Sequence, residues 1–210
     1  TLGKMGAGDS ASNWFYSDMI LIWGSNPNYT HTANFHYIPE ARYNGTKVVA
    51  VTPDYNASVP FADLWVPIKI GTDAALALAM CQVIITKGLY KADFVREQTD
   101  LPRLVRTDTR RFLRESDRKR GGAENQLYLF DQKTKQVVEA PLKSLALGDV
   151  VPALEGEYEV GTLRGRVKVK PVFEFLKEKL RDYTPEKASQ ITGVSAKLIG
   201  ELAEQFARAR

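Results

Sequence analysis

The sequence predicts an α/β protein, with a mostly parallel sheet covered by helices on both faces. Three observations support this fold class. Short, fully apolar segments occur three times in the first seventy residues, a helical segment separates the first two, and a long apolar helix follows the third. Strands of this composition are typical of parallel sheets, because helices bury both faces of such a sheet.

The first two predicted strands are Met19–Trp23 (MILIW) and Lys47–Val51 (KVVAV). Between them, Thr30–Asn44 is expected to be a helix that ends before Gly45, since an Asn-Gly pair is a frequent carboxy-terminal stop. Pro39 lies inside this segment, so the helix is either kinked at Pro39 or starts again there. Strand, helix and strand in about 30 residues make one right-handed βαβ unit.

The third predicted strand is Leu64–Ile68 (LWVPI), and a helix is expected from Gly71 to Gly88. This helix is apolar on nearly every side, which predicts that it is buried. Cys81 lies in the middle of it and is expected to be a core residue rather than a nucleophile. Because Cys81 is the only cysteine, an internal disulfide and a cysteine-ligated iron–sulfur or zinc site are excluded within this chain.

The rest of the chain predicts a small β-hairpin insertion followed by C-terminal helices. The segments QLYLFDQKTKQVVEA and GEYEVGTLRGRVKVK alternate in polarity on either side of turn residues, as two hairpins would. Helices are expected over Val172–Leu180 and Ala196–Ala207, with Thr184 (before Pro185) and Ser195 as N-caps. We therefore expect three regions: an α/β core over 1–105, the insertion over 106–171, and helices completing the same domain over 172–210.

Positive charge is concentrated in one segment. Arg103–Arg120 holds eight basic and three acidic side chains, a net charge of +5, whereas the whole chain carries +4. A solvated or partner-facing segment is the favoured interpretation. Nucleic-acid binding is disfavoured, because no aromatic residues alternate with the basic ones as a stacking platform requires.

Three loops leave the carboxyl ends of the predicted strands: Gly24–Thr30, Thr52–Ser58 and Ile70–Asp73. In a Rossmann-like, doubly wound sheet, ligands bind at this edge. Gly24 allows the backbone to turn sharply and to approach a ligand closely. The Gly-Ser-Asn-Pro sequence that starts there is, taken alone, more often a simple turn, but three such loops in order favour a binding site.

Asp73 has two interpretations. It can cap the helix that follows, which is the commoner role of an aspartate at this position. Its carboxylate can instead accept two parallel N–H bonds from the edge of a guanine base. The amino-terminal N–H groups of the helix also favour negative charge nearby.

The motifs WGSNPN, EARYNGTKVVAVTPDYNAS and FADLWVPIKIGTDAALALAM, in this order, closely resemble the molybdopterin oxidoreductases of the dimethyl sulfoxide reductase family. The TPDYNAS form is similar to the group of respiratory nitrate, selenate, chlorate and perchlorate reductases, dimethyl sulfide dehydrogenase and ethylbenzene dehydrogenase. The resemblance continues through FVREQTDLPRLVRTDTRRFLRES and YTPEKASQITGVSAKLIGELAEQFA, and so covers most of the chain.

The resemblance implies one of two related α/β domains that hold a pair of molybdopterin guanine dinucleotides. It also implies which loops contact the cofactor: the first wraps the diphosphate and ribose, the second lines the guanosine pocket, and the third closes on the guanine, with Asp73 as the specificity residue. The implied cofactor-binding residues are Trp23, Gly24, Ser25, Asn26, Pro27, Asn28, Thr30, Thr52, Pro53, Asp54, Tyr55, Asn56, Gly71, Thr72 and Asp73. His31 and His36 are expected to lie at the surface, although His31 could touch a cofactor phosphate.

The same family implies features that this chain lacks. Its catalytic subunits carry an amino-terminal cysteine cluster for a four-iron centre, and an aspartate that binds molybdenum lies upstream of Thr1 in the narrower group. Asp9 and Asp18 do not match that position, so no catalytic or metal-binding residue is assigned. We expect a central fragment of a larger subunit, inactive alone, whose partners are the remainder of the subunit and an iron–sulfur electron-transfer subunit.

The parent enzyme is expected to be an oxyanion reductase in anaerobic respiration, with a hydrocarbon or dimethyl sulfide dehydrogenase as the alternative. A stand-alone, non-catalytic nucleotide-binding module remains a second hypothesis. No apolar run reaches the ~18 residues that span a bilayer, so no direct membrane span is expected. By resemblance, the complex is periplasmic or membrane-associated, and a cytoplasmic location is the alternative.

Overall fold

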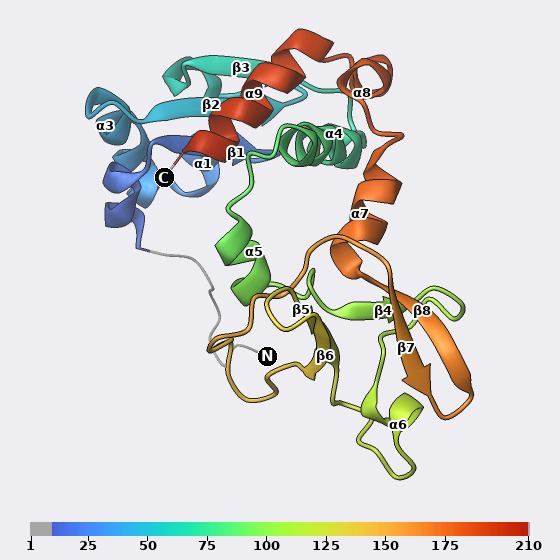
Figure 1. Cartoon of the computed structure of the whole chain (residues 1–210). Helices are drawn as coiled ribbons and strands as arrows, with labels where there is room; N and C mark the ends of the chain where they lie inside the picture. The colour runs from blue at the N-terminus through green and yellow to red at the C-terminus, as the bar shows by residue number, and fades with distance from the viewer. Residues whose placement is uncertain (1–9, 210) are drawn as a thin grey trace. The chain divides into compact units, whose positions relative to one another are not determined.

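A computed structural model gives the fold of the chain and describes residues 10–209. Within that range the chain forms two compact units, one made of 10–89 with 182–209 and the other of 90–181 (Figure 1). The regions expected from the sequence, 1–105, 106–171 and 172–210, divide the chain elsewhere. The second unit is larger than the expected insertion because Leu104–Arg106 pairs with the second hairpin and Tyr90 packs against Phe173.

The first unit contains a three-stranded parallel sheet in the order β1-β2-β3. Its strands are β1 (Met19–Trp23), β2 (Lys47–Thr52) and β3 (Leu64–Pro67). The predicted strands are confirmed, with ends that differ by at most one residue. In the register, Leu21 lies opposite Val49, and Val51 lies opposite Val66.

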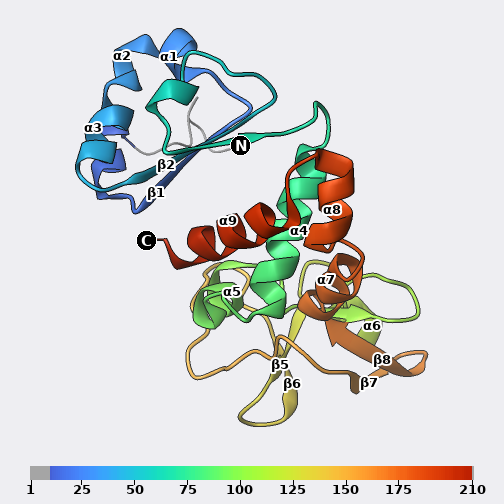
Figure 2. The same cartoon turned by 90° about the horizontal axis from the view of Figure 1, so that it is seen from above.

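One face of this sheet is covered by three helices, α4 (Asp73–Thr86), α8 (Pro185–Thr192) and α9 (Ala196–Arg208), as Figure 2 shows. Buried valines of β2 and β3 pack there against apolar side chains of the helices. Both predicted caps are confirmed, since Thr184 Oγ1 accepts from the Lys187 N–H and Ser195 Oγ from the Leu198 N–H, each at 3.3 Å.

The other face is covered by short helical segments. They are two 3₁₀ helices, η1 (Ala11–Tyr16) and η2 (Val59–Phe61), with α2 (Thr32–Phe35) and α3 (Tyr37–Tyr43); α1 (Pro27–Thr30) precedes α2. Helices on both faces of a parallel sheet confirm the predicted fold class.

The prediction of one helix over Thr30–Asn44, kinked or starting again at Pro39, is wrong, but its predicted end at Asn44-Gly45 is confirmed, with Asn44 as the C-cap of α3. Two short helices, α2 and α3, occupy most of this stretch, and α1 ends at its first residue, Thr30; the helices are separated at His31 and His36. His31 has a non-helical backbone (φ −132°, ψ 44°), which interrupts the hydrogen-bond ladder. Pro39 is the third residue of α3, where its missing N–H leaves no intrahelical bond unmade, so it needs no kink.

The burial predicted for Cys81 is also wrong. Helix α4 faces the core through Leu76, Ala79, Met80 and Val83, and Cys81 lies on its exposed side. An apolar helix need not be buried on every side, so composition alone could not place this cysteine. Surrounding apolar groups still desolvate the thiol and raise its pKa, which lowers the thiolate fraction.

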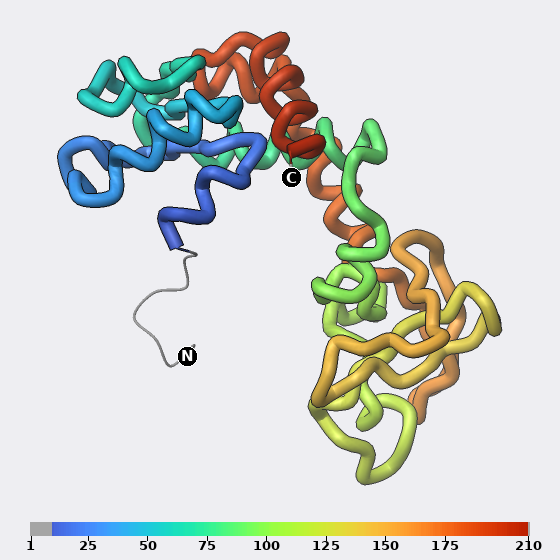
Figure 3. The backbone as a smooth tube through the Cα atoms, turned by 90° about the vertical axis from the view of Figure 1, so that its left-hand side faces the viewer, coloured from blue at the N-terminus to red at the C-terminus, as the bar shows by residue number. Residues whose placement is uncertain are grey.

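The second unit is built from hairpins and short helices, and Figure 3 traces its backbone in colours that run from green to orange. Both predicted hairpins are confirmed, as β5–β6 and β7–β8, and β8 also pairs with β4 to give the antiparallel order β4-β8-β7. The elements are α5 (Ala92–Gln98), β4 (Leu104–Arg106), α6 (Glu115–Arg118), β5 (Tyr128–Asp131), β6 (Gln136–Glu139), β7 (Tyr158–Thr162), β8 (Gly165–Pro171) and α7 (Val172–Leu180).

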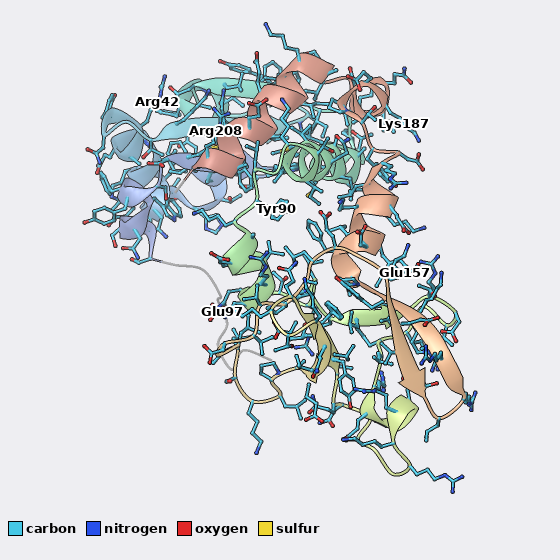
Figure 4. The ribbon with its side chains drawn as sticks, in the orientation of Figure 1. Arg42, Tyr90, Glu97, Glu157, Lys187 and Arg208 are labelled. Atoms are coloured by element: carbon cyan, nitrogen blue, oxygen red, sulfur yellow. The ribbon has the colours of Figure 1, made fainter. Side chains whose placement is uncertain are left out.

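Around the apolar core of this unit, charged side chains form several ion pairs. In the basic segment, the Arg106 guanidinium is mostly buried and contacts the carboxylates of both Asp108 and Asp117. Glu157, labelled in Figure 4, pairs with Lys168 at 2.8 Å, and this contact lowers the pKa of the glutamate. Arg118 lies over the Tyr128 ring at 4.5 Å. Several charges of the basic segment therefore make contacts inside the unit.

None of the helices within residues 10–209 combines the length and the apolar character that crossing a bilayer requires.

Candidate functional site

The candidate site lies where the three parallel strands of the first unit end. In the register Trp23 is opposite Val51, and Thr52 is opposite Pro67, so the carboxyl ends of β1, β2 and β3 lie side by side. The loops that follow these strands are the three predicted from the sequence. Ligands of open α/β sheets bind at this edge.

The first loop turns at Gly24, where the backbone φ is +61° and its N–H donates to the Val51 carbonyl at 2.9 Å. A Cβ at Gly24 would meet nothing within 4 Å. Glycine is therefore required by the positive φ rather than by crowding, and the space beside this backbone is open. Ser25 is exposed next to it, and Pro27 is buried as the first residue of α1.

The first and second loops are joined through Ser58, a fully buried residue. Its hydroxyl donates to Asn26 Oδ1 at 2.7 Å and accepts from the Asn28 N–H at 3.0 Å. The Asn28 side-chain amide also donates to the Ala57 carbonyl at 2.8 Å. The sequence places Ser58 in the second predicted loop but predicts no role for it, because a serine in a turn-rich segment carries no signal of burial.

Within the second loop, the predicted residues fall into two groups. Thr52 is buried and donates to the Asp54 carbonyl at 2.7 Å, and Asn56 Oδ1 accepts from the Ser58 N–H at 3.0 Å. These two side chains shape the loop. The other three residues are exposed: Pro53, Asp54 and Tyr55.

The indoles of two tryptophans donate hydrogen bonds to residues of the loops. The Trp65 indole N–H contacts the carbonyl and hydroxyl oxygens of Thr52, both at 3.2 Å, and the Tyr55 ring packs edge-on against the Trp65 ring with centroids 5.2 Å apart. The Trp23 indole N–H donates to Asp73 Oδ1 at 2.8 Å, which connects the first loop to the third. Ser58 thus links the first and second loops, and Trp23, the residue just before the first loop, contacts the third.

The third loop contains Gly71, which has a φ of +78°. As at Gly24, a Cβ at this position would meet nothing within 4 Å. Thr72 is the N-cap of α4, but its hydroxyl donates to the Lys69 carbonyl at 2.6 Å and no side chain caps the helix. Asp73 is the first residue of α4. The interpretation of Asp73 as a side-chain cap is therefore wrong, and its carboxylate accepts a bond from Trp23 instead.

Each of six predicted residues therefore makes a hydrogen bond within a loop or between two loops: Trp23, Asn26, Asn28, Thr52, Asn56 and Asp73. Ser25 and Thr30 lie exposed on the first loop, as do His31 and His36 nearby. Open backbone at two glycines, amide and hydroxyl groups, and a carboxylate at a helix amino terminus suit a ligand that carries phosphate and a hydrogen-bonding base.

Away from this edge of the sheet, binding of a ligand or a metal ion would need a cavity or a cluster of coordinating side chains. A cavity of about 330 Å³ is found in the second unit, between α5 and the 140–147 segment. Within residues 10–209, no three histidine, cysteine, aspartate or glutamate side chains lie close enough together to hold a metal ion. Asp9 lies outside the described residues.

Comparison with known proteins gives consistent relatives. The chain is 42% identical to the perchlorate reductase subunit alpha of Dechloromonas aromatica (strain RCB), 43% to the chlorate reductase subunit alpha of Ideonella dechloratans, and 43% to the dimethylsulfide dehydrogenase subunit alpha of Rhodovulum sulfidophilum. These matches cover 100%, 94% and 94% of this chain, but 26%, 22% and 22% of the relatives. The chain thus spans about a quarter of the length of these proteins.

The fold is shared with a solved structure. Acetylene hydratase from Pelobacter acetylenicus superimposes with a TM-score of 0.53 at 22% identity, over 94% of this chain and 19% of that one. The family model described as molybdopterin oxidoreductase matches residues 4–199. The chain therefore belongs to the molybdopterin oxidoreductase family.

Proposed function

We propose that the three loops bind the guanosine diphosphate half of a molybdopterin guanine dinucleotide. The observation that carries this proposal is the Asp73 carboxylate, which lies at the amino terminus of α4 without capping it. An ionised carboxylate accepts hydrogen bonds only, and a guanine edge presents two adjacent donors, N1–H and the exocyclic amine. The helix amino terminus stabilises the negative charge of Asp73 in this position.

The residues fit such a cofactor by their chemistry and by the space around them. In this proposal, a ligand can approach the backbone closely at Gly24 and Gly71. The space that a Cβ would occupy at either glycine is free of other atoms. Ser25, Asn28 and Thr30 supply polar groups beside the diphosphate and ribose. Pro53, Asp54 and Tyr55 form the exposed wall of the guanosine pocket, while Thr52 and Asn56 act by shaping the loop.

When bound, the cofactor supplies the redox chemistry of molybdenum, while this chain's residues hold and orient its nucleotide end. We propose that the full-length protein is the catalytic subunit of an oxyanion reductase, because two of the three relatives above are named as reductases of chlorate or perchlorate. The third relative supports a dimethyl sulfide dehydrogenase as the alternative.

All three relatives are named as alpha subunits, which supports an assembly with further subunits. We propose that one partner is an iron–sulfur electron-transfer subunit and that the complex is periplasmic or membrane-associated. Metal analysis of the purified full-length protein separates this from a stand-alone nucleotide-binding module, which would contain neither molybdenum nor iron.

The cofactor proposal is tested by acid hydrolysis of the purified full-length protein, which cleaves the pyrophosphate and releases the nucleotide. We expect guanosine monophosphate to be the released nucleotide. An Asp73→Ala variant loses hydrogen bonds to a charged group, at roughly 1.5–3 kcal/mol each, and should bind guanosine diphosphate at least about tenfold more weakly. Release of another nucleotide, or equal affinity in a folded variant, would contradict the proposal.

A further inference from the structure

The contact between Trp23 and Asp73 joins residues that lie fifty positions apart. Trp23 is the last residue of β1 and Asp73 is the first residue of α4. Both side chains are partly buried, and the indole nitrogen lies 2.8 Å from Oδ1. An indole is a hydrogen-bond donor only, so it can orient a carboxylate without competing for the donors of a ligand.

The contact uses only part of what the carboxylate offers. Two carboxylate oxygens provide about four acceptor positions, and the Trp23 indole fills one of them. Within residues 10–209, Oδ2 of Asp73 accepts no hydrogen bond. Since a neutral indole leaves the negative charge of Asp73 unpaired, the charge remains available for a ligand.

Trp23 also prevents an alternative arrangement. The terminal torsion of an aspartate side chain is broad, so the carboxylate rotates easily unless a neighbour holds it. No side chain caps the amino terminus of α4, and a free Asp73 carboxylate would turn toward those uncapped N–H groups. The bond from Trp23 gives the carboxylate a fixed partner outside its own helix.

We propose, on the basis of the function proposed above, that Trp23 is a positioning residue for base selection. Its indole N–H fixes the plane of the Asp73 carboxylate so that both oxygens can meet the two donors of a guanine edge. This hydrogen bond fixes the positions of the first and third loops relative to each other before the nucleotide binds.

The test compares three nucleotides on cofactor-free full-length protein by titration calorimetry: guanosine, inosine and adenosine diphosphate. Hypoxanthine lacks the exocyclic amine of guanine, so the ratio of guanosine to inosine diphosphate affinity reports the second of the two bonds. For the unmodified protein we expect a ratio of about ten or more. In Trp23→Phe we expect this ratio to fall about tenfold, toward one, with adenosine diphosphate remaining weakest or equal.

The control is the same exchange at Trp14, whose ring packs on the other face of the sheet. Trp14→Phe should leave the ratio unchanged. Asp73→Asn should abolish the ratio, and adding Trp23→Phe to it should change nothing further, because Trp23 acts only through Asp73. If Trp23→Phe does not fold, a benzothienyl analogue of tryptophan at position 23 keeps the ring shape and replaces the N–H with sulfur.

The outcomes are separable. An equal loss of affinity for all three nucleotides in Trp23→Phe would show a merely structural role and overturn the inference, as would an unchanged ratio. In either case a ratio lost in Asp73→Asn would leave the proposed function intact. No preference for guanine in the unmodified protein would instead refute the base assignment in the proposed function.

Discussion

Replacing Ser58 by alanine should loosen the first loop of the site while leaving the sheet beneath it intact. The hydroxyl of this buried serine makes two hydrogen bonds across to the first loop, one to Asn26 and one to Asn28. Alanine fits the same space without a cavity, so the cost comes from the polar groups left without partners. Buried polar groups left unsatisfied cost about 1–3 kcal/mol each.

The magnitude follows from the exposure of the two asparagines. Both are half-buried, so water replaces part of the lost bonding. We therefore take the low end for each group and expect about 2 kcal/mol in total. At ~1.4 kcal/mol per decade, local opening should become about thirtyfold more frequent.

Hydrogen exchange with peptide-resolved mass spectrometry on the full-length protein measures this opening directly. Amides of residues 26–31 should exchange about thirtyfold faster in Ser58→Ala, while those of β2 should not change. Ser25→Ala is the matched control, because the Ser25 side chain is exposed and makes no hydrogen bond within residues 10–209. Unchanged exchange in Ser58→Ala, or an equal change in Ser25→Ala, would refute the argument that Ser58 joins the two loops.

Three further predictions concern charge and backbone. The Thr134 hydroxyl and backbone N–H groups lower the pKa of Asp131 from 3.8 to about 2, so the stability it adds is present above pH 4 and is lost as pH falls toward 2; Asp131→Asn should remove that dependence from melting curves. Arg106→Met should destabilise the second unit by about 1–3 kcal/mol in urea unfolding, because the Arg106 ion pair is mostly buried. Arg166→Met, at an exposed pair, should change stability by less than about 0.5 kcal/mol, and equal effects would show that burial does not strengthen the Arg106 pair. Gly24→Ala forces a positive φ on alanine and should cost about 1–2 kcal/mol, unlike Gly161→Ala, where φ is not positive; equal melting temperatures would count against this strain.

The sheet could be predicted because its signals are local. Each strand is an apolar run followed at once by a turn, and helix α4 is a long apolar segment between glycines. The caps at Thr184 and Ser195 were equally predictable, since a capping side chain acts within three residues of itself. In these elements the local preference and the final packing agree.

The errors occur where local signals are weak or ambiguous. The 30–44 stretch has helical composition, but no sequence signal marks the breaks at His31 and His36. Helices α2 and α3 pack on one face of the sheet through Phe35 and Ile38, so tertiary contacts set their limits. Likewise, the composition of α4 predicts burial but does not determine which of its sides lacks a neighbour.

The contacts that organise the site are non-local, which is why only their residue types could be predicted. Trp23 and Asp73 belong to separate motifs, and each motif alone is compatible with an ordinary turn or helix start. The fold brings them to 2.8 Å because β1 ends and α4 begins at the same edge of one sheet. Ser58 acts in the same way between the first and second loops. Since each link uses a side chain from a different loop, a change in one loop should alter how its neighbour presents groups to the ligand. The effects of paired substitutions across these links should therefore be non-additive, while substitutions at exposed positions such as Ser25 should add independently.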